Sequence, residues 1–407
     1  MFRKLSALIL YTLVFTSSSL FCWASASRGA EKPRIVVDSV PNVGGRDLVR
    51  GHIEFDGNGN FSDFVSGGDD RIAERLYVYL IPASFIPDEN ANRTEKAALD
   101  VVTIDRHEGR TDIRQQKHPA AFKHPKRTKK LSLNYSPYTR TLSPEENSPI
   151  SAEHVRRQLA LIHPYTDTIK IFGVTGELNK IYKIAKEEFN FRIIGGCWIA
   201  YYSSPSDIRN ELDTLIGLVD SGYIDVALVG SEAIFRNDLP VSDLINHIQY
   251  VRGKIKSNVP VGTADIFAIF LENPALTEAC DVVGVNIYPF HSGIPADIAV
   301  WNLYDSYMSV ANAAAGKHII VTETGWPSAG RPRGSAIPSD ADSGKYFEDV
   351  YRFSREEDIE IVWFSSYSEP WKASAAASEA HFGLFTSDEK LKEQFEPILR
   401  TIPDTPD

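Results

Sequence analysis

Two glutamates stand where apolar runs of the sequence end. Glu232 follows Leu228–Ser231, and Glu323 follows Val321–Thr322. A carboxyl group next to a buried run costs free energy unless it is paired or hydrogen-bonded, and a structural salt bridge would explain either glutamate alone. Retaining cleavage of a glycosidic bond needs two carboxyl groups about 5–5.5 Å apart, because one protonates the leaving oxygen while the other attacks the anomeric carbon. The pair therefore indicates acid–base and nucleophilic chemistry on a sugar.

The elements that must position these glutamates alternate regularly from residue 131 onward. We expect strands at Leu131–Tyr135, Thr168–Phe172, Arg192–Trp198, Asp225–Val229, Val259–Ala264, Asp281–Ile287, His318–Thr322 and Ile359–Ser365. We expect amphipathic helices at 151–163, 177–188, 206–221, 241–256, 273–279, 297–314, 340–357 and 388–399, with caps at Ser151, Ser206 and Ser242. Eight strand–helix pairs predict a (β/α)8 TIM barrel, in which catalytic groups lie at the carboxyl ends of the strands. Glu232 would then follow the fourth strand and Glu323 would end the seventh.

A doubly wound open sheet would share this local alternation. Such a sheet carries a glycine-rich phosphate loop after its first strand. The first expected strand here runs instead into Asn134-Tyr135-Ser136-Pro137-Tyr138, which is no nucleotide fingerprint. The barrel is therefore the favoured architecture.

The preceding residues have a different character. Residues 27–112 read as a small β-rich, sandwich-like module, with strands expected at Ile35–Asp38, Leu48–Phe55, Arg75–Ile81 and Leu99–Asp105. Residues 113–130 read as a basic linker, and a contact surface for an anionic partner is the alternative. The barrel domain then occupies 131–407. The module is a candidate for binding glycan or another protein.

Residues 1–26 resemble a secretory signal peptide. Arg3 and Lys4 precede an apolar stretch at Leu5–Phe15, and Ala24–Ala26 forms a small-x-small cleavage site. The stretch is short and is followed by serines, although a retained anchor is the alternative reading. We expect an exported protein, periplasmic or extracellular, whose mature chain has no membrane span.

Composition excludes several classes of protein. With 43% hydrophobic and 24% charged residues the chain is neither disordered nor collagen-like. A formal net charge of −11 argues against nucleic acid as a partner. The sequence contains neither CxxC nor HExxH, and we expect no metal and no cofactor. Cys197 and Cys280 lie in apolar runs, which predicts buried thiols, although an exported compartment would permit a disulfide.

Several longer motifs make a family resemblance visible. The most specific runs from Val321 to Gly330 (VTETGWPSAG), and four others support it: Gly196–Ile199, Asn286–Pro289, Glu369–Lys372 and His381–Phe385. Over roughly residues 131–400 the chain resembles glycoside hydrolase family 17 in its bacterial branch, a family of β-1,3-glucanases and β-1,3-glucanosyltransferases. The resemblance implies a retaining enzyme on β-1,3-linked glucan, with Glu323 as nucleophile and Glu232 as acid/base. Hydrolysis and transglycosylation remain alternatives, because water or a sugar hydroxyl can intercept the same glycosyl-enzyme.

One residue departs from the family pattern. The family usually has Asn directly before the acid/base, and here the residue is Ser231. That Asn is thought to hydrogen-bond the sugar 2-hydroxyl, a contact that tightens in the transition state. A serine side chain is shorter, which leaves a glycan-binding pseudoenzyme as an alternative from another class.

Further side chains near the expected strand ends are candidates for substrate binding. The resemblance implies that Tyr288 hydrogen-bonds Glu323, and that Asp265 binds a sugar hydroxyl or orients Glu232. Sugar-stacking platforms are expected among the tryptophans Trp198, Trp326, Trp363 and Trp371, each of which could equally pack in the core. Tyr201 and Tyr202 are expected to line a subsite on the loop after the third strand. Glu369 is expected to be a hydrogen-bond or ion-pair partner in the cleft, with Lys372 as its companion. An apolar setting and the nearby Glu323 charge should raise the pKa of Glu232.

Overall fold

The computed structural model describes residues 131–402 except 315, 375 and 376, together with eight strands in the part of the chain before them. The chain divides into two units, Met1–Phe122 and Lys123–Asp407. Each unit is described here by itself.

The first unit contains two antiparallel four-stranded sheets. One has the strand order β1-β6-β7-β8 and the other β2-β3-β4-β5. Their bounds are β1 Tyr11–Thr16, β2 Ala24–Ala26, β3 Arg34–Val37, β4 Gly51–Phe55, β5 Phe61–Ser66, β6 Arg75–Ile81, β7 Asp100–His107 and β8 Arg110–Lys117. Strands β3, β4, β6 and β7 overlap the four strands that the sequence predicts, whereas β5 and β8 were not predicted. Strand β8 reaches into the expected linker at 113–130, and β1 and β2 fall within the expected signal peptide, which stays a prediction.

The second unit is a closed barrel of eight parallel strands. The order around the barrel is β10-β11-β12-β13-β14-β15-β16-β9, so every strand pairs with its sequence neighbour and β16 closes on β9. The bounds are β9 Leu131–Asn134, β10 Thr166–Ile171, β11 Arg192–Cys197, β12 Val226–Ser231, β13 Val261–Ile266, β14 Val282–Asn286, β15 His318–Thr324 and β16 Ile361–Trp363. Each of these overlaps one predicted strand, and the (β/α)8 prediction is confirmed.

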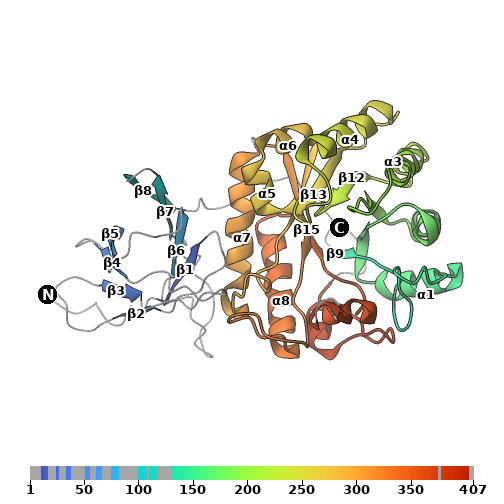
Figure 1. Ribbon diagram of the computed structural model, residues 1–407. Helices are drawn as coiled ribbons and strands as arrows, with labels where there is room; N and C mark the ends of the chain where they lie inside the picture. The colour runs from blue at the N-terminus through green and yellow to red at the C-terminus, as the bar shows by residue number, and fades with distance from the viewer. Residues whose placement is uncertain are drawn as a thin grey trace. The chain divides into compact units, whose positions relative to one another are not determined.

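Helices surround the strands on the outside of the barrel (Figure 1). They are α1 Ala152–Ile162, α2 Asn179–Phe189, α3 Pro205–Asp220, α4 Val241–Lys254, α5 Phe267–Glu272, α6 Pro274–Ala279, α7 Ala296–Ala313, α8 Asp340–Glu356 and α9 Glu396–Leu399. Three-residue 3₁₀ turns lie at Gly176–Leu178, Glu379–His381 and Glu393–Phe395, and a longer one at Pro370–Ser374. The layer between strands and helices is apolar, and burying each large aliphatic side chain there contributes about 1.5–3 kcal/mol.

Three local predictions about the helices need correction. The helix expected at 388–399 is wrong: Glu389 has a left-handed φ of +65°, and helix begins only at Glu396, where Pro397 fits the first turn. Ser151 caps α1 as predicted, since its side chain accepts from the His154 amide. The caps expected at Ser206 and Ser242 are wrong, because Ser204 forms the capping box of α3 and Pro240 precedes α4 without a side-chain cap.

The interior of the barrel follows the alternation of each strand. Side chains such as Leu228, Ala264 and Ile320 form a small inner cluster, while their sequence neighbours pack outward against the helices. Polar side chains take the inward positions nearer the carboxyl ends, among them Asn134, Lys170 and Asn286. The barrel is therefore apolar at depth and polar at its mouth.

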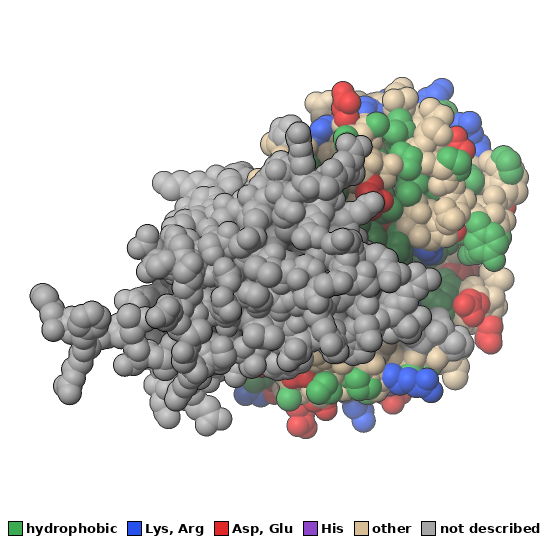
Figure 2. Space-filling view, turned by 60° about the vertical axis from the view of Figure 1, so that its left-hand side comes forward, with side chains coloured by type: hydrophobic (Ala, Val, Ile, Leu, Met, Phe, Trp, Pro, Cys, Tyr) green, Lys and Arg blue, Asp and Glu red, His purple; other side chains and the backbone are tan. Residues whose placement is uncertain are grey.

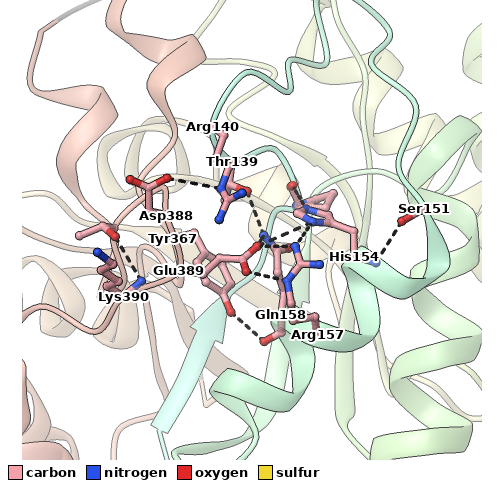
Figure 3. A network of polar contacts seen from close by, with 12 residues as sticks. Thr139, Arg140, Ser151, His154, Arg157, Gln158, Tyr367, Asp388, Glu389 and Lys390 are labelled. Atoms are coloured by element: carbon pink, nitrogen blue, oxygen red, sulfur yellow. Dashed lines mark hydrogen bonds and ion pairs between the residues drawn. The ribbon is translucent and has the colours of Figure 1, made fainter.

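A polar network ties the last loop of the barrel to α1 (Figure 3). Glu389 accepts from Arg157 Nε at 2.7 Å and Nη2 at 2.9 Å, and from Gln158 Nε2 at 3.3 Å. The hydroxyl of Tyr367 donates to the Gln158 carbonyl oxygen at 2.7 Å. Contacts between residues more than 200 positions apart thus hold the seam where β16 meets β9.

Four findings bear on the class of protein. No helix in the described residues is long and apolar enough to cross a membrane. Within the same residues, no group of three or more His, Cys, Asp and Glu side chains could hold a metal ion. Cys197 and Cys280 are buried free thiols, as predicted. Figure 2 shows acidic, basic and apolar side chains interspersed on the described part of its face, without a large patch of one charge.

Candidate active site

Glu323, the second-last residue of β15, is a buried carboxylate with three donors. Its Oε1 accepts from Lys170 Nζ at 2.7 Å and from Ser231 Oγ at 3.3 Å, and its Oε2 accepts from the Tyr288 hydroxyl at 2.9 Å. Burial by itself would raise the pKa of Glu323, but the Lys170 ammonium and the two shortest hydrogen bonds outweigh it and hold the pKa below its ordinary value. Glu323 is therefore an ionised carboxylate at neutral pH.

Glu232 follows β12 in an unusual backbone conformation. Its φ is +54°, in the left-handed region that a non-glycine residue rarely adopts, and Gly230, two residues earlier, has a φ of +79°. The Glu232 amide donates to the Ala264 carbonyl oxygen at 2.8 Å, which fixes this turn to β13. Burial, then the charge of Glu323, raises the pKa of Glu232 to about 7. The predicted elevation is confirmed, and the pKa values of the two glutamates are separated, that of Glu232 being raised and that of Glu323 lowered.

A buried amide, that of Asn286, holds the Glu232 carboxyl group. Asn286 Nδ2 donates to Glu232 Oε1 at 2.9 Å, while Asn286 Oδ1 accepts from Thr322 Oγ1 at 2.7 Å. Asn286 pairs with Glu323 across a register shift between β14 and β15, and such irregularities re-aim side chains next to active sites. The hydroxyl of Thr322 thus sets the orientation of the amide that holds Glu232.

Asp265 orients the segment after Glu232. Its side chain is fully buried; Oδ2 accepts from the amides of Ile234 at 3.1 Å and Phe235 at 3.5 Å, and Oδ1 accepts from the Ile266 amide at 2.9 Å. Burial raises the pKa of Asp265 to about 6. Of the two predicted roles, the contacts support orientation of the acid/base segment.

The prediction that tryptophans stack on sugar is wrong for two of them. Trp326 and Trp363 are fully buried and pack with Tyr346, so neither presents a face to a ligand. The residue after Trp363 has the opposite orientation: the Phe364 ring lies 5.9 Å from the ring of Tyr288. Successive strand residues point to opposite faces. The side chain at the mouth is therefore that of Phe364, one residue after the predicted Trp363.

Glycine is required at position 325, directly after the strand that carries the expected nucleophile. A Cβ on Gly325 would lie 2.1 Å from the Phe364 carbonyl oxygen. Any side chain there would push β15 away from β16 and displace Glu323, which lies two residues earlier. This accounts for the glycine in the most specific motif of the sequence.

The remaining predicted residues divide between two sides of the mouth. Trp198 is 36% exposed and Tyr202 is 71% exposed, on the loop after β11. After β16, Glu369 accepts from Trp371 Nε1 at 3.2 Å and pairs with Lys372 Nζ at 2.6 Å. The predicted pairing of Glu369 with Lys372 is confirmed, and Trp371 is half-buried there rather than an open platform.

Sequence reasoning missed four side chains of this region. They are the side chains of Lys170, Arg236, Phe364 and Asn286, the last through its contact to Glu232. Lys170 had a usable signal, because a lysine inside the run Thr168–Phe172 occupies the inward position between Ile169 and Ile171 and costs free energy unless it is paired. The others depend on which strand ends meet, which spacing along the chain does not encode.

A closed parallel barrel with two glutamates of separated pKa at the carboxyl ends of its strands is the architecture of a barrel glycosidase. The chain belongs to the family of the BtgE/BtgC glycoside hydrolase domain, whose model matches residues 132–383. The expected resemblance to glycoside hydrolase family 17 is confirmed.

Individual relatives agree with this assignment. A glucan 1,3-beta-glucosidase of Saccharomyces cerevisiae is 28% identical over 265 residues, which cover 60% of this chain and 84% of the relative. A probable glucan endo-1,3-beta-glucosidase of Aspergillus fumigatus is 27% identical, and the match covers 60% of this chain and 40% of that protein. Among solved structures, a family 17 beta-1,3-glucanosyltransferase of Rhizomucor miehei superposes with a TM-score of 0.58 at 27% identity, covering 65% of this chain and 96% of that one. An active-site mutant of it was solved with laminaritriose.

Proposed function

We propose that this glycoside hydrolase cleaves β-1,3-linked glucan with retention, by double displacement. The observation that carries the proposal is the separation of the two glutamate pKa values, with Glu232 raised to about 7 and Glu323 held below its ordinary value. Two carboxyl groups in different protonation states at neutral pH can act as acid and nucleophile. The β-1,3 linkage is inferred from the names of the relatives and from the laminaritriose complex.

In the first step the proton of Glu232 passes to the glycosidic oxygen as the bond between that oxygen and the anomeric carbon breaks. A carboxylate oxygen of Glu323 forms the new bond to the anomeric carbon. The hydrogen bonds from Lys170 and Tyr288 hold Glu323 ionised and aimed before the attack. Asn286 holds the carboxyl of Glu232 on its side of the cleft.

In the second step an incoming hydroxyl attacks the anomeric carbon and the bond to Glu323 breaks. Glu232, now a carboxylate, takes the proton of that hydroxyl. Water gives hydrolysis, and a sugar hydroxyl gives a longer glucan. Both steps balance with the two glutamates. Glu232 gives and regains the proton, and Glu323 supplies the electron pair of the new bond and leaves with it.

Transfer to sugar is the second candidate outcome, and one observation favours it. Exposed aromatic rings of Trp198, Tyr201 and Tyr202 lie on the loop after β11, and Phe235 lies three residues after Glu232. The acid/base side of a retaining site is the side of the leaving group and of the acceptor, so these rings could hold an acceptor sugar. Products longer than the substrate, at high oligosaccharide concentration, would establish transfer.

The pseudoenzyme alternative rests on Ser231, which points at Glu323 rather than away from the cleft. Its hydroxyl donates to the expected nucleophile at 3.3 Å. Both carboxyl groups keep their partners, which favours an active enzyme. In an active enzyme, replacing Ser231 with Asn should change kcat. A binding protein would show no turnover with either residue.

The test is product analysis on a linear β-1,3-glucan with wild type, Glu232→Gln and Glu323→Gln. We expect loss of turnover in both variants, while Glu272→Gln, an exposed glutamate at the end of α5, keeps wild-type activity. Full turnover by Glu323→Gln would overturn the proposed mechanism. Binding without turnover by wild type would select the pseudoenzyme.

Export is a further part of the proposal. Cleavage near Ala26 would remove Arg3 and Lys4 and no acidic residue, leaving a more acidic chain. The mass of the protein recovered from the periplasm or medium tests this. A product that retains residues 1–26 would contradict it.

We also propose that residues 27–112 bind glycan or another protein. The test uses the full chain carrying Glu323→Gln, sedimented with insoluble β-1,3-glucan. Binding that a saturating soluble trisaccharide does not displace would support a second site outside the barrel mouth. Complete displacement would contradict glycan binding by this module.

A further inference from the structure

Arg236 contacts both loops on the acid/base side of the mouth, and double displacement assigns it no task. It lies four residues after Glu232. Its Nη1 donates to the Ser231 carbonyl oxygen at 2.6 Å, and its Nη2 donates to the Ile199 carbonyl oxygen at 3.2 Å. One guanidinium thus joins the backbone next to the acid/base to the backbone of the loop after β11.

The same guanidinium covers an exposed aromatic ring. Its central carbon lies 4.4 Å from the centre of the Trp198 ring, within the range of a cation–π contact. The Trp198 amide donates to Glu211 Oε2 at 3.1 Å, so the backbone of this residue is also fixed. Because 36% of Trp198 remains exposed, the ring is held in place and still accessible.

Asp238 completes the arrangement. Its carboxylate is almost fully buried and accepts from Arg236 Nε at 2.9 Å and from the Tyr201 amide at 3.0 Å. Asp238 therefore fixes both the guanidinium and the segment that carries Tyr201 and Tyr202. Together the two side chains link two loops that are adjacent only in the folded barrel.

We propose that Arg236, anchored by Asp238, is a positioning residue that couples the aromatic surface at Trp198 and Tyr201 to the acid/base Glu232. A sugar on that surface is then held in register with the proton of Glu232. This inference rests on the proposed function. It adds a determinant of how the leaving-group side, which is also the acceptor side, is aligned with the acid.

The chemistry of the side chain explains why arginine is needed. A planar guanidinium offers five donors in a fixed fork and can stack on an aromatic ring at the same time. A lysine retains the positive charge but is a single point, so it cannot hold two carbonyl oxygens, a carboxylate and a ring together. Arg236→Lys therefore separates the geometric role from the charge.

Two substrates distinguish this role from a general structural one. For a retaining enzyme kcat/KM reports the steps up to the glycosyl-enzyme. A β-1,3-gluco-oligosaccharide needs both a leaving-group sugar in register and the acid proton. A nitrophenyl β-1,3-glucobioside has a leaving group that departs without acid help and has no sugar for Trp198.

We expect Arg236→Lys to lower kcat/KM about tenfold or more on the oligosaccharide, since small misplacements of reacting groups can cost up to about a hundredfold. On the nitrophenyl substrate we expect a change of less than about twofold. The matched control is Arg252→Lys, because Arg252 also joins a carboxylate and a carbonyl oxygen, in the last turn of α4 and away from the mouth. Trp198→Ala combined with Arg236→Lys should be non-additive on the oligosaccharide.

Equal loss on both substrates, or no loss on either, would overturn the inference. If Arg236→Lys does not fold, Asp238→Asn removes the anchor instead, and the same selective loss on the oligosaccharide is expected. Wild type that cleaves neither substrate would overturn the proposed function, and the inference falls with it. If wild type cleaves both substrates and Arg236→Lys affects the two equally, the inference is overturned while the proposed function stands.

Discussion

Lys170 determines the charge of the expected nucleophile. Its ammonium is buried with Glu323 at 2.7 Å, and burial lowers the pKa of Lys170 while the carboxylate opposes that change. A buried carboxylate that loses its cation becomes easier to protonate, because desolvation then acts without compensation. We therefore expect the ionisation of Glu323 to depend on one lysine in β10.

We expect Lys170→Met to lower kcat/KM at pH 6 by about a hundredfold and to move the acidic limb of the pH profile upward, as the pKa of Glu323 rises. The profile of kcat/KM against pH measures both effects. Lys345→Met, which removes a half-exposed partner of Asp349, should leave the profile unchanged. An unaltered acidic limb in Lys170→Met would contradict this account.

We expect Glu232 to set the basic limb of the same pH profile. Burial, then the charge of Glu323, raises its pKa to about 7, so the acid proton is lost as the pH rises through that value. We expect kcat/KM on an oligosaccharide to fall above about pH 7. In Glu232→Gln, measured on a nitrophenyl β-1,3-glucobioside that needs no acid, this basic limb should disappear. A basic limb that persists there would assign the titration to another group.

At the scale of elements, the seam between α1 and the loop after β16 is built from few contacts. Glu389 is nearly buried and receives two hydrogen bonds from Arg157, while the neighbouring Asp388 pairs with Arg140 at the surface at 3.4 Å. Exposed pairs contribute little to stability, whereas a buried acceptor left without its charged donor costs more. The two neighbouring acids should therefore behave differently.

We expect Glu389→Gln to lower Tm by about 2–4 °C at pH 7, which corresponds to about 1 kcal/mol. The hydrogen bond and charge of Arg157 lower the pKa of Glu389, so this stabilisation is present above the ordinary glutamate pKa and is lost as the pH falls through the lower folded value. The destabilisation should accordingly vanish in acid. Asp388→Asn is the control, and thermal melts in which it matches Glu389→Gln would contradict the proposed seam.

The same scale shows how much the sequence could predict. All eight barrel strands were predictable, because each is an apolar run bounded by turn residues. The prediction of a helix at 388–399 failed, because Pro397 and the left-handed Glu389 interrupt the periodic residues. Trp363 was expected at the mouth, where the structure places Phe364, because the inward direction of a strand depends on the register of its neighbours. Glu232 and Glu323 could be singled out as acids directly after apolar runs, whereas the contacts of Arg236 depend on two loops that only the closed barrel brings together.

At the scale of the whole molecule, the polar mouth of the barrel opposes its stability. Glu232 and Asp265 are acids whose folded pKa values, about 7 and about 6, lie above their ordinary values. For such groups the folded state binds more protons than the unfolded state, so stability falls as the pH rises from the unfolded to the folded pKa. Above pH 7 the fold must hold ionised carboxylates that burial disfavours, which is a stability cost typical of functional sites.

We therefore expect Glu232→Gln to be more stable than wild type at pH 8, with a Tm higher by about 2 °C or more, and to differ little at pH 4.5, where wild-type Glu232 is protonated in the folded state. Thermal melts of both proteins across this range measure the effect. Asp265→Asn is a weaker case, because its amide group would lose one of the three backbone amides that the carboxylate accepts. A Glu232→Gln protein less stable than wild type at pH 8 would mean that the hydrogen bond from Asn286 outweighs desolvation, and that Glu232 stabilises the fold as an anion.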